Sequence, residues 1–150
     1  MGKSLIIKGA DFAVNAVVAG YKNLINPAEI EQRKYIDQNG DIGDGEALYA
    51  VSGYIPVNGK DIYCPTEMST DTTPSPVFSG YIVYNANREV IRFNRLRTKQ
   101  YTYVEGDAYV RFPLRNDSLN YPSRTDGFNY PAHFAAYGNR ALPYVPYESE

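Results

Sequence analysis

Hydrophobic and polar residues alternate through the middle of the chain, in short runs separated by turn-forming residues. The alternation is clearest at 108–112, where Ala108, Val110 and Phe112 fall on one side and Tyr109 and Arg111 on the other. Strict alternation of this kind predicts a β-strand with one face toward a core. Similar short runs, each typical of a strand, occur at 35–36, 49–57, 62–64, 77–84, 89–93 and 101–104.

The residues between these runs are those that build tight turns. The dipeptides at 39–40 and 58–59 are both Asn-Gly, which adopts the positive φ angles of a hairpin turn. The second of them predicts a hairpin between 49–57 and 62–64, with Cys64 as a small core residue. Short strands separated by turns at this spacing are typical of sandwiches and barrels. The sequence therefore predicts an all-β, antiparallel β-sandwich.

The two ends of the chain differ from this middle region. Asn26-Pro27 is typical of a helix start, and the helix is expected to run to about Lys34; 10–19 gives a weaker helical signal. The last residues are rich in tyrosine and proline, and proline cannot donate within a sheet. We therefore expect three parts: an N-terminal strand or helix segment and possible docking element, the β-sandwich core, and an extended arm that packs on its own domain or on a neighbour. Their ranges are 1–34, 35–115 and 116–150.

Composition supports a sheet and excludes some partners. The 150 residues, enough for one domain with a sizeable core, include fifteen tyrosines and no tryptophan. Tyrosine suits half-buried sheet surfaces because its ring packs while its hydroxyl stays hydrated. The net charge of −2 disfavours nucleic acid as a partner, and no apolar stretch is long enough for membrane insertion. The start of the chain lacks the apolar run of a signal peptide.

Motifs for metal binding and catalysis are weak. The acidic run 37–46 resembles a calcium loop, but Ile42 occupies the position of the turn glycine and Leu48 that of the bidentate glutamate. The alternative is an acidic turn between strands. His133 is the only histidine and lies in no recognisable catalytic motif, nothing singles out a glycosidase pair of carboxylates, and the glycines form no nucleotide loop. We expect a protein that is not an enzyme, with no metal and no cofactor.

Aromatic and planar polar side chains on the predicted strands suggest a sugar-binding face instead. Flat rings beside amide and guanidinium groups suit sugars, whose C–H faces stack and whose hydroxyls need donors and acceptors. The alternative is an ordinary polar sheet face, or one that the Tyr/Pro arm covers. The candidate carbohydrate-binding residues are Tyr84 and Asn85, at the end of one predicted strand, and Arg92, Tyr109 and Arg111, which are expected to face outward.

The order of several short motifs resembles that of a known group of proteins. These motifs are YIDQNG at 35–40, SGYIPV at 52–57, VYN at 83–85 with VI at 90–91, and AYVRF at 108–112. They resemble the β-sandwich (jelly-roll-like) fibre and tail domains of phages that infect Bacteroides-type gut bacteria, and related bacterial surface proteins. The opening SLIIKGADF at 4–12 is similar to the start of many such phage structural proteins.

The resemblance implies a module exposed on the virion that decorates the particle or contacts host glycans. The expected function is a structural component of a bacteriophage particle: a fibre, a head-fibre (head decoration) or a tail-associated subunit. Its expected partners are other virion subunits, further copies in a homo-oligomer with a trimer favoured, and a host surface glycan. The alternative is a stand-alone carbohydrate-binding module at the bacterial cell surface. A small glycan-active enzyme is the third hypothesis.

Overall fold

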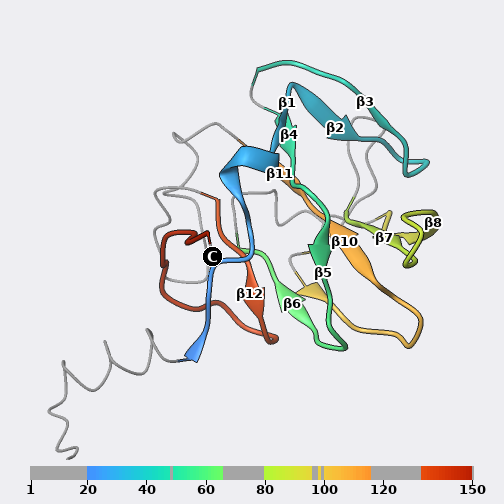
Figure 1. Cartoon of the computed structure of the whole chain (residues 1–150). Coiled ribbons are helices and arrows are strands. Elements are labelled where there is room, and N and C mark those ends of the chain that lie inside the picture. Colours follow the sequence, from blue (N-terminus) through green and yellow to red (C-terminus); the bar gives the residue numbers. More distant parts are fainter. Residues whose placement is uncertain are drawn as a thin grey trace, which may run out of the picture.

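The computed structural model describes residues 20–47, 49–65, 80–95, 98, 100–115 and 133–149, and they form an all-β fold of several antiparallel sheets (Figure 1). The predicted fold class, a sandwich-like all-β domain, is confirmed. The strands in the described residues are β1 (Glu31–Gln32), β2 (Lys34–Ile36), β3 (Ile42–Asp44), β4 (Tyr49–Val51), β5 (Ile55–Pro56), β6 (Ile62–Tyr63), β7 (Ile82–Tyr84), β8 (Val90–Phe93), β9 (Gln100–Tyr101), β10 (Tyr109–Arg111), β11 (Pro113–Arg115) and β12 (Ala136–Tyr137).

Within the described residues, the short helical turn η1 (Pro27–Glu29) precedes the strands. Asn26 caps it as predicted, because its side chain accepts a hydrogen bond from the Ala28 N–H and Pro27 occupies the first turn. The prediction that the helix reaches about Lys34 is wrong. Ile30 is already extended (φ −70°, ψ 130°), and β1 and β2 occupy the rest of that stretch.

Four sheets are built from these strands, and every pairing is antiparallel. The largest has the order β5-β10-β7-β8, two others have the orders β1-β4-β11 and β12-β6-β9, and β2 pairs with β3. Figure 1 shows the β2–β3 hairpin at the top of the molecule and β7 and β8 on the right. Neighbours in a sheet are often distant in sequence, so tertiary contacts rather than local hairpins hold most strands.

The two Asn-Gly turns have different outcomes. The first joins β2 to β3 as a hairpin, with Gly40 at φ 84°. At the second, Asn58 and Gly59 both have positive φ, and the Lys60 N–H donates to the Val57 carbonyl. The predicted pairing of the flanking strands is nevertheless wrong: β5 pairs with β10, and β6 pairs with β9 and β12. The turn is tight, but its two strands diverge into different sheets.

Both faces of the β5-β10-β7-β8 sheet contribute side chains to a core, although Val90 and Ile91 on β8 are exposed. One face contributes Ile55, Val83 and Val110 to the main core, which also contains Ile25, Ala50, Val57, Ile62, Cys64, Tyr101, Phe112, Leu114 and Ala135. The other face contributes Ile82 and Tyr84 to a second core with Ile36 and Val51. Cys64 is fully buried, as predicted. The second core explains why Tyr84 and Arg111, on this second face of the sheet, are buried.

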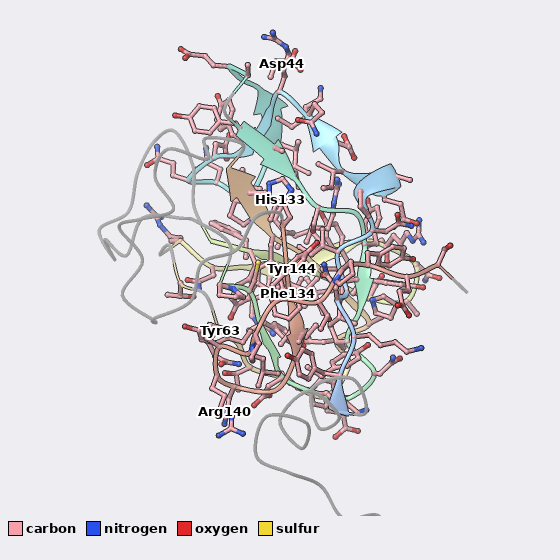
Figure 2. The ribbon with its side chains drawn as sticks, turned by 90° about the vertical axis from the view of Figure 1, so that its left-hand side faces the viewer. Asp44, Tyr63, His133, Phe134, Arg140 and Tyr144 are labelled. Atoms are coloured by element: carbon pink, nitrogen blue, oxygen red, sulfur yellow. The ribbon has the colours of Figure 1, made fainter. Side chains whose placement is uncertain are left out.

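The described ends of the chain lie beside each other. The Asn23 side chain donates to the His133 carbonyl and accepts from the Ala135 N–H, and β12 pairs with β6. Phe134 is buried between Tyr21 and Tyr144, with ring centroids 6.1 and 5.8 Å away; Figure 2 shows Phe134 and Tyr144 side by side. Rings of the Tyr/Pro segment therefore pack on their own domain.

Several predicted features lie outside the described residues. They are the weak helix at 10–19, the first three residues of the predicted strand at 77–84, and the part of the predicted arm from 116 to 132.

Candidate binding site

A depression of about 360 Å³ opens between the segment that contains η1 and β1 and the β5-β10-β7-β8 sheet. It combines two carboxylates, two guanidiniums and one aromatic ring, brought together from four distant parts of the sequence. The lining residues are Glu29, Glu31, Gly53, Tyr54, Arg88 and Arg111. Its volume falls within the range of roughly 300–1,000 Å³ typical of small-ligand sites.

Tyr54 is the aromatic centre of the depression. Its ring makes edge contacts with Tyr84 and Tyr109 at centroid distances of 4.8 and 6.0 Å. The guanidinium carbons of Arg88 and Arg111 lie 4.5 and 4.7 Å from the same centroid. Such cation–π contacts fix the planes of the guanidiniums relative to the ring. Tyr54 therefore organises both arginines.

Arg111, on β10, is a buried member of the site. It is 4% exposed; its Nε–H donates to the Ser52 carbonyl at 2.8 Å, and Nη2 lies 2.6 Å from Glu31 Oε2. The side chain of Glu31 is about half exposed, so one end of this ion pair reaches the depression. Arg111 holds the strand junction together and leaves its partner carboxylate at the surface.

Arg88 is held by the turn between β7 and β8. The Asn85 side chain accepts hydrogen bonds from the N–H groups of Asn87 and Glu89, and Arg88 itself has φ 63°. This left-handed conformation is uncommon for a residue other than glycine. The turn places the guanidinium over the Tyr54 and Tyr109 rings, at 4.5 and 5.1 Å. No ion pair among the described residues includes Arg88.

Glu29 and Glu31 lie on one wall of the depression. Ile30 between them is extended, so the side chains two residues apart point the same way. Gly53 is the close neighbour of this wall: a Cβ added there would lie 2.6 Å from Glu29 Oε1 and 2.7 Å from Glu29 Cβ. Only glycine therefore lets Glu29 approach this closely.

The structure places the five predicted sugar-binding residues in three different settings. Tyr84, Tyr109 and Arg111 share one face and surround Tyr54. The predicted outward position of Arg111 is wrong, because this residue is 4% exposed; Tyr84 is buried to the same extent, in the second core. Burial raises the pKa of the Tyr84 hydroxyl, and nearby Arg111 opposes this only in part. Asn85 shapes the turn that carries Arg88.

Arg92 lies on the face of the sheet opposite to that of Tyr84, Tyr109 and Arg111. Tyr84 pairs with Val90, but Val83 pairs with Arg92, so Ile91 is an extra residue in β8. Such a bulge reverses the side to which the following residues point. Arg92 therefore shares the face of Val83, away from the depression, and the prediction that it faces outward is corrected.

On that opposite face the partly exposed Arg92 pairs with the buried Asp107 in a polar cluster. Its guanidinium makes two hydrogen bonds to the Asp107 carboxylate, at 3.0 and 2.6 Å, and the Tyr101 hydroxyl donates to Asp107 at 2.5 Å. Burial alone would raise the pKa of Asp107, but the hydrogen bonds from Arg92 and Tyr101 outweigh it and hold that pKa below its usual value. Burial and the same carboxylate raise the pKa of Tyr101. This cluster stabilises the fold.

The acidic run 37–46 forms the β2–β3 hairpin, the alternative considered for it. The Asp37 carboxylate accepts hydrogen bonds from the N–H groups of Asn39 and Asp41 within the turn. Asp44 pairs with Lys34 across the hairpin at 2.5 Å, and this hydrogen bond lowers the pKa of Asp44. In the described ranges, no three histidine, cysteine, aspartate or glutamate side chains are grouped as a metal ion would need.

Five of the six lining residues were not predicted from the sequence. Tyr54 and Gly53 lie within the SGYIPV motif, where an aromatic residue beside a glycine was the available signal. Arg88 lay in a predicted turn, and turn residues often carry binding side chains. Glu29 and Glu31 gave no signal, because only the antiparallel pairing of β1 with β4 brings them next to Gly53 and Tyr54.

Comparison of the chain with protein-family models, with curated proteins and with solved structures gives no match. Among the residues that the structure describes, no helix is long and apolar enough to cross a membrane.

Proposed function

We propose that the chain is a non-enzymatic structural or decoration component of a phage particle and that it binds glycans of the host surface. It would be a fibre, head-fibre or tail-associated subunit, with other virion subunits and further copies of itself as partners. A trimer is the favoured homo-oligomer. The resemblance of its strand motifs to phage fibre and tail domains supports the setting, and the all-β fold is compatible with it.

The observation that carries the glycan part of the proposal is the depression around Tyr54. Exposed carboxylate oxygens of Glu29 and Glu31 and the N–H groups of Arg88 converge on one small volume. Sugar hydroxyls both donate and accept hydrogen bonds, so they can satisfy carboxylates and a guanidinium at once. Charge-assisted hydrogen bonds of this kind are stronger than neutral ones.

The arrangement of the two carboxylates favours binding over hydrolysis. In most glycoside hydrolases two carboxyl groups flank the scissile bond, one as the acid and one as nucleophile or base. Glu29 ends η1 and Glu31 begins β1, so both project from one short segment on the same wall, and Glu31 is ion-paired with Arg111. Two acceptors on one wall suit a pair of neighbouring hydroxyls.

Glycan-array binding of the purified chain, compared with an Arg88→Ala variant, tests the glycan part. We expect the chain to bind some glycans of the array and the variant to bind them with about 10- to 100-fold lower affinity, which corresponds to the loss of a hydrogen bond to a charged group. Lys60→Ala is a matched control, because it also removes a cation 5.0 Å from a tyrosine centroid, that of Tyr137, which does not line the depression. Equal binding by all three proteins would refute this site.

Fractionation of a culture that produces the chain tests its setting. Purified phage particles should contain it in a fixed number of copies, and light scattering of the isolated chain should give the mass of an oligomer. A chain recovered only with the bacterial envelope would instead support the alternative, a stand-alone carbohydrate-binding module of a bacterial surface system. A monomer absent from particles would refute the virion proposal.

A further inference from the structure

The hydrogen-bonding groups that remain available in the depression define the chemistry of its ligand. Arg111 is engaged by Ser52 and Glu31. No hydrogen bond or ion pair between described residues engages the side chain of Glu29 or the guanidinium of Arg88. Among the described residues, Glu29 therefore offers a ligand an unpaired acceptor and Arg88 an unpaired donor, on separate segments of the chain, beside the ion-paired Glu31.

The charges of the lining cancel. Glu29 and Glu31 contribute two negative charges and Arg88 and Arg111 two positive ones. An anionic sugar would find Arg88 but would also face the unpaired carboxylate of Glu29. A like charge close to a carboxylate disfavours its ionised form. The lining thus provides no net charge to compensate a charged ligand for the water it loses.

Hydrogen bonds rather than ring stacking dominate this site. The guanidiniums of Arg88 and Arg111 already lie over the Tyr54 ring, at 4.5 and 4.7 Å from its centroid. The Tyr84 and Tyr109 rings contact the Tyr54 ring as well. The aromatic surface therefore positions the arginines, and the ligand is recognised by its hydroxyl groups.

Resting on the proposed glycan binding, we infer that the depression selects an uncharged sugar ring and discriminates against carboxylated sugars. Glu29 accepts hydrogen bonds from neighbouring hydroxyls of the ring, and Arg88 donates to a hydroxyl or ring oxygen. Gly53 is the specificity-supporting residue, because a Cβ there would meet Glu29 Oε1 at 2.6 Å and displace this acceptor.

Matched pairs of sugars test the inference. Titration calorimetry would compare the chain's affinity for a glucose-terminated and a glucuronate-terminated oligosaccharide, and for the galactose and galacturonate pair, from 50 to 500 mM NaCl. The members of each pair differ only in a hydroxymethyl or carboxylate group. We expect the neutral member to bind at least tenfold more tightly, with little dependence on salt, which screens charge–charge interactions.

Two variants assign the discrimination to Glu29. Glu29→Gln removes the charge and keeps the size of an exposed side chain, so the fold should be unaffected; we expect weaker neutral-sugar binding and a smaller gap between the members of each pair. Gly53→Ala should have the same effect by displacing Glu29, and its thermal unfolding shows whether the domain is intact.

The outcomes separate this inference from the proposal on which it rests. Tighter binding of the carboxylated member, abolished by Arg88→Ala and weakened strongly by salt, would overturn the inference and leave glycan binding in place. An unchanged gap in Glu29→Gln would also overturn it. Failure of the chain to bind any sugar on the array or in the calorimeter would overturn both.

Discussion

At the scale of single residues, Arg111 on the four-stranded sheet and Arg88 in its β7–β8 turn have different roles. Arg111 is 4% exposed and bonded to Ser52 and Glu31, whereas Arg88 is exposed and lies over two tyrosine rings. Arg92, the third arginine of this sheet, is bonded to Asp107. Their positions in the sequence do not distinguish them. Burial and partners do, and they determine which substitution reports on binding and which on stability.

Arg111→Ala and Arg88→Ala should therefore separate stability from binding. Arg111→Ala leaves the Ser52 carbonyl and the Glu31 carboxylate without their partner, and we expect a loss of about 3 kcal/mol in the free energy of unfolding. Arg88→Ala removes an exposed side chain and should change it by about 0.5 kcal/mol or less. Urea denaturation measures both values. Similar losses in the two variants would contradict the distinction.

Asp107 gives the fold a defined response to acid. The pKa of the Asp107 carboxyl in the folded state lies below the unfolded value of about 3.9. Its contribution to the free energy of unfolding is therefore fully present above that value and is lost as pH falls through the folded pKa. We expect stability to decrease as pH falls below about 4. Asp107→Asn should lower the unfolding free energy at pH 7 by about 2–3 kcal/mol and flatten this acid dependence.

Urea denaturation at several pH values between 2 and 7 measures the acid response. Glu105→Gln, an exposed carboxylate in the same turn, is the control and should retain the wild-type profile. An Asp107→Asn profile as steep as that of the wild type would show that other carboxylates dominate the response.

At the scale of elements, turns and bulges decide which residues meet. The extra residue Ile91 in β8 moves Arg92 to the face opposite Tyr84, and the turn around Asn85 holds Arg88 over Tyr54. Each of these is a local feature of the backbone. Together they determine the composition of the depression more than the alternation along the strands does.

Replacing the glycine of each Asn-Gly turn by alanine should lower the stability of the protein by different amounts. Gly40 has φ 84°, and a Cβ there would lie 2.7 Å from two ring atoms of Phe93, whereas Gly59 has φ 70° and open space. Both substitutions cost about 1–2 kcal/mol from the left-handed backbone. Gly40→Ala should cost about 1–3 kcal/mol more from overpacking. Thermal unfolding compares them, and equal losses would mean that Phe93 moves aside freely.

At the scale of the whole molecule, the two described ends complete the domain. β1 pairs with β4, β12 pairs with β6, and Ile25 and Ala135 lie in the main core. The residues after 132 thus contribute core side chains as well as tyrosines at the surface. Removing them would expose apolar surface of the remaining domain.

Phe134→Ala should accordingly destabilise the entire domain. Phe134 is 1% exposed between Tyr21 and Tyr144, and deleting a buried phenylalanine side chain costs about 3–5 kcal/mol. Tyr147→Ala, outside this cluster, is the control and should cost about 1 kcal/mol or less. Urea denaturation measures the free energy of unfolding of both variants, followed by tyrosine fluorescence because the chain has no tryptophan. A small effect of Phe134→Ala would show that this end packs independently of the core.

The sequence by itself determined the fold class, the turns and the inward positions of Cys64, Val110 and Phe112, because alternation, Asn-Gly chemistry and capping at Asn26 act over a few residues. Only the tertiary structure decided which strands pair, which face of the sheet is covered, and that Glu29 and Arg88 line one depression. These depend on contacts between residues far apart in the chain, and a single bulge or a second core reverses what local alternation predicts. For this reason the sequence indicated part of the candidate site, and the packing supplied the rest.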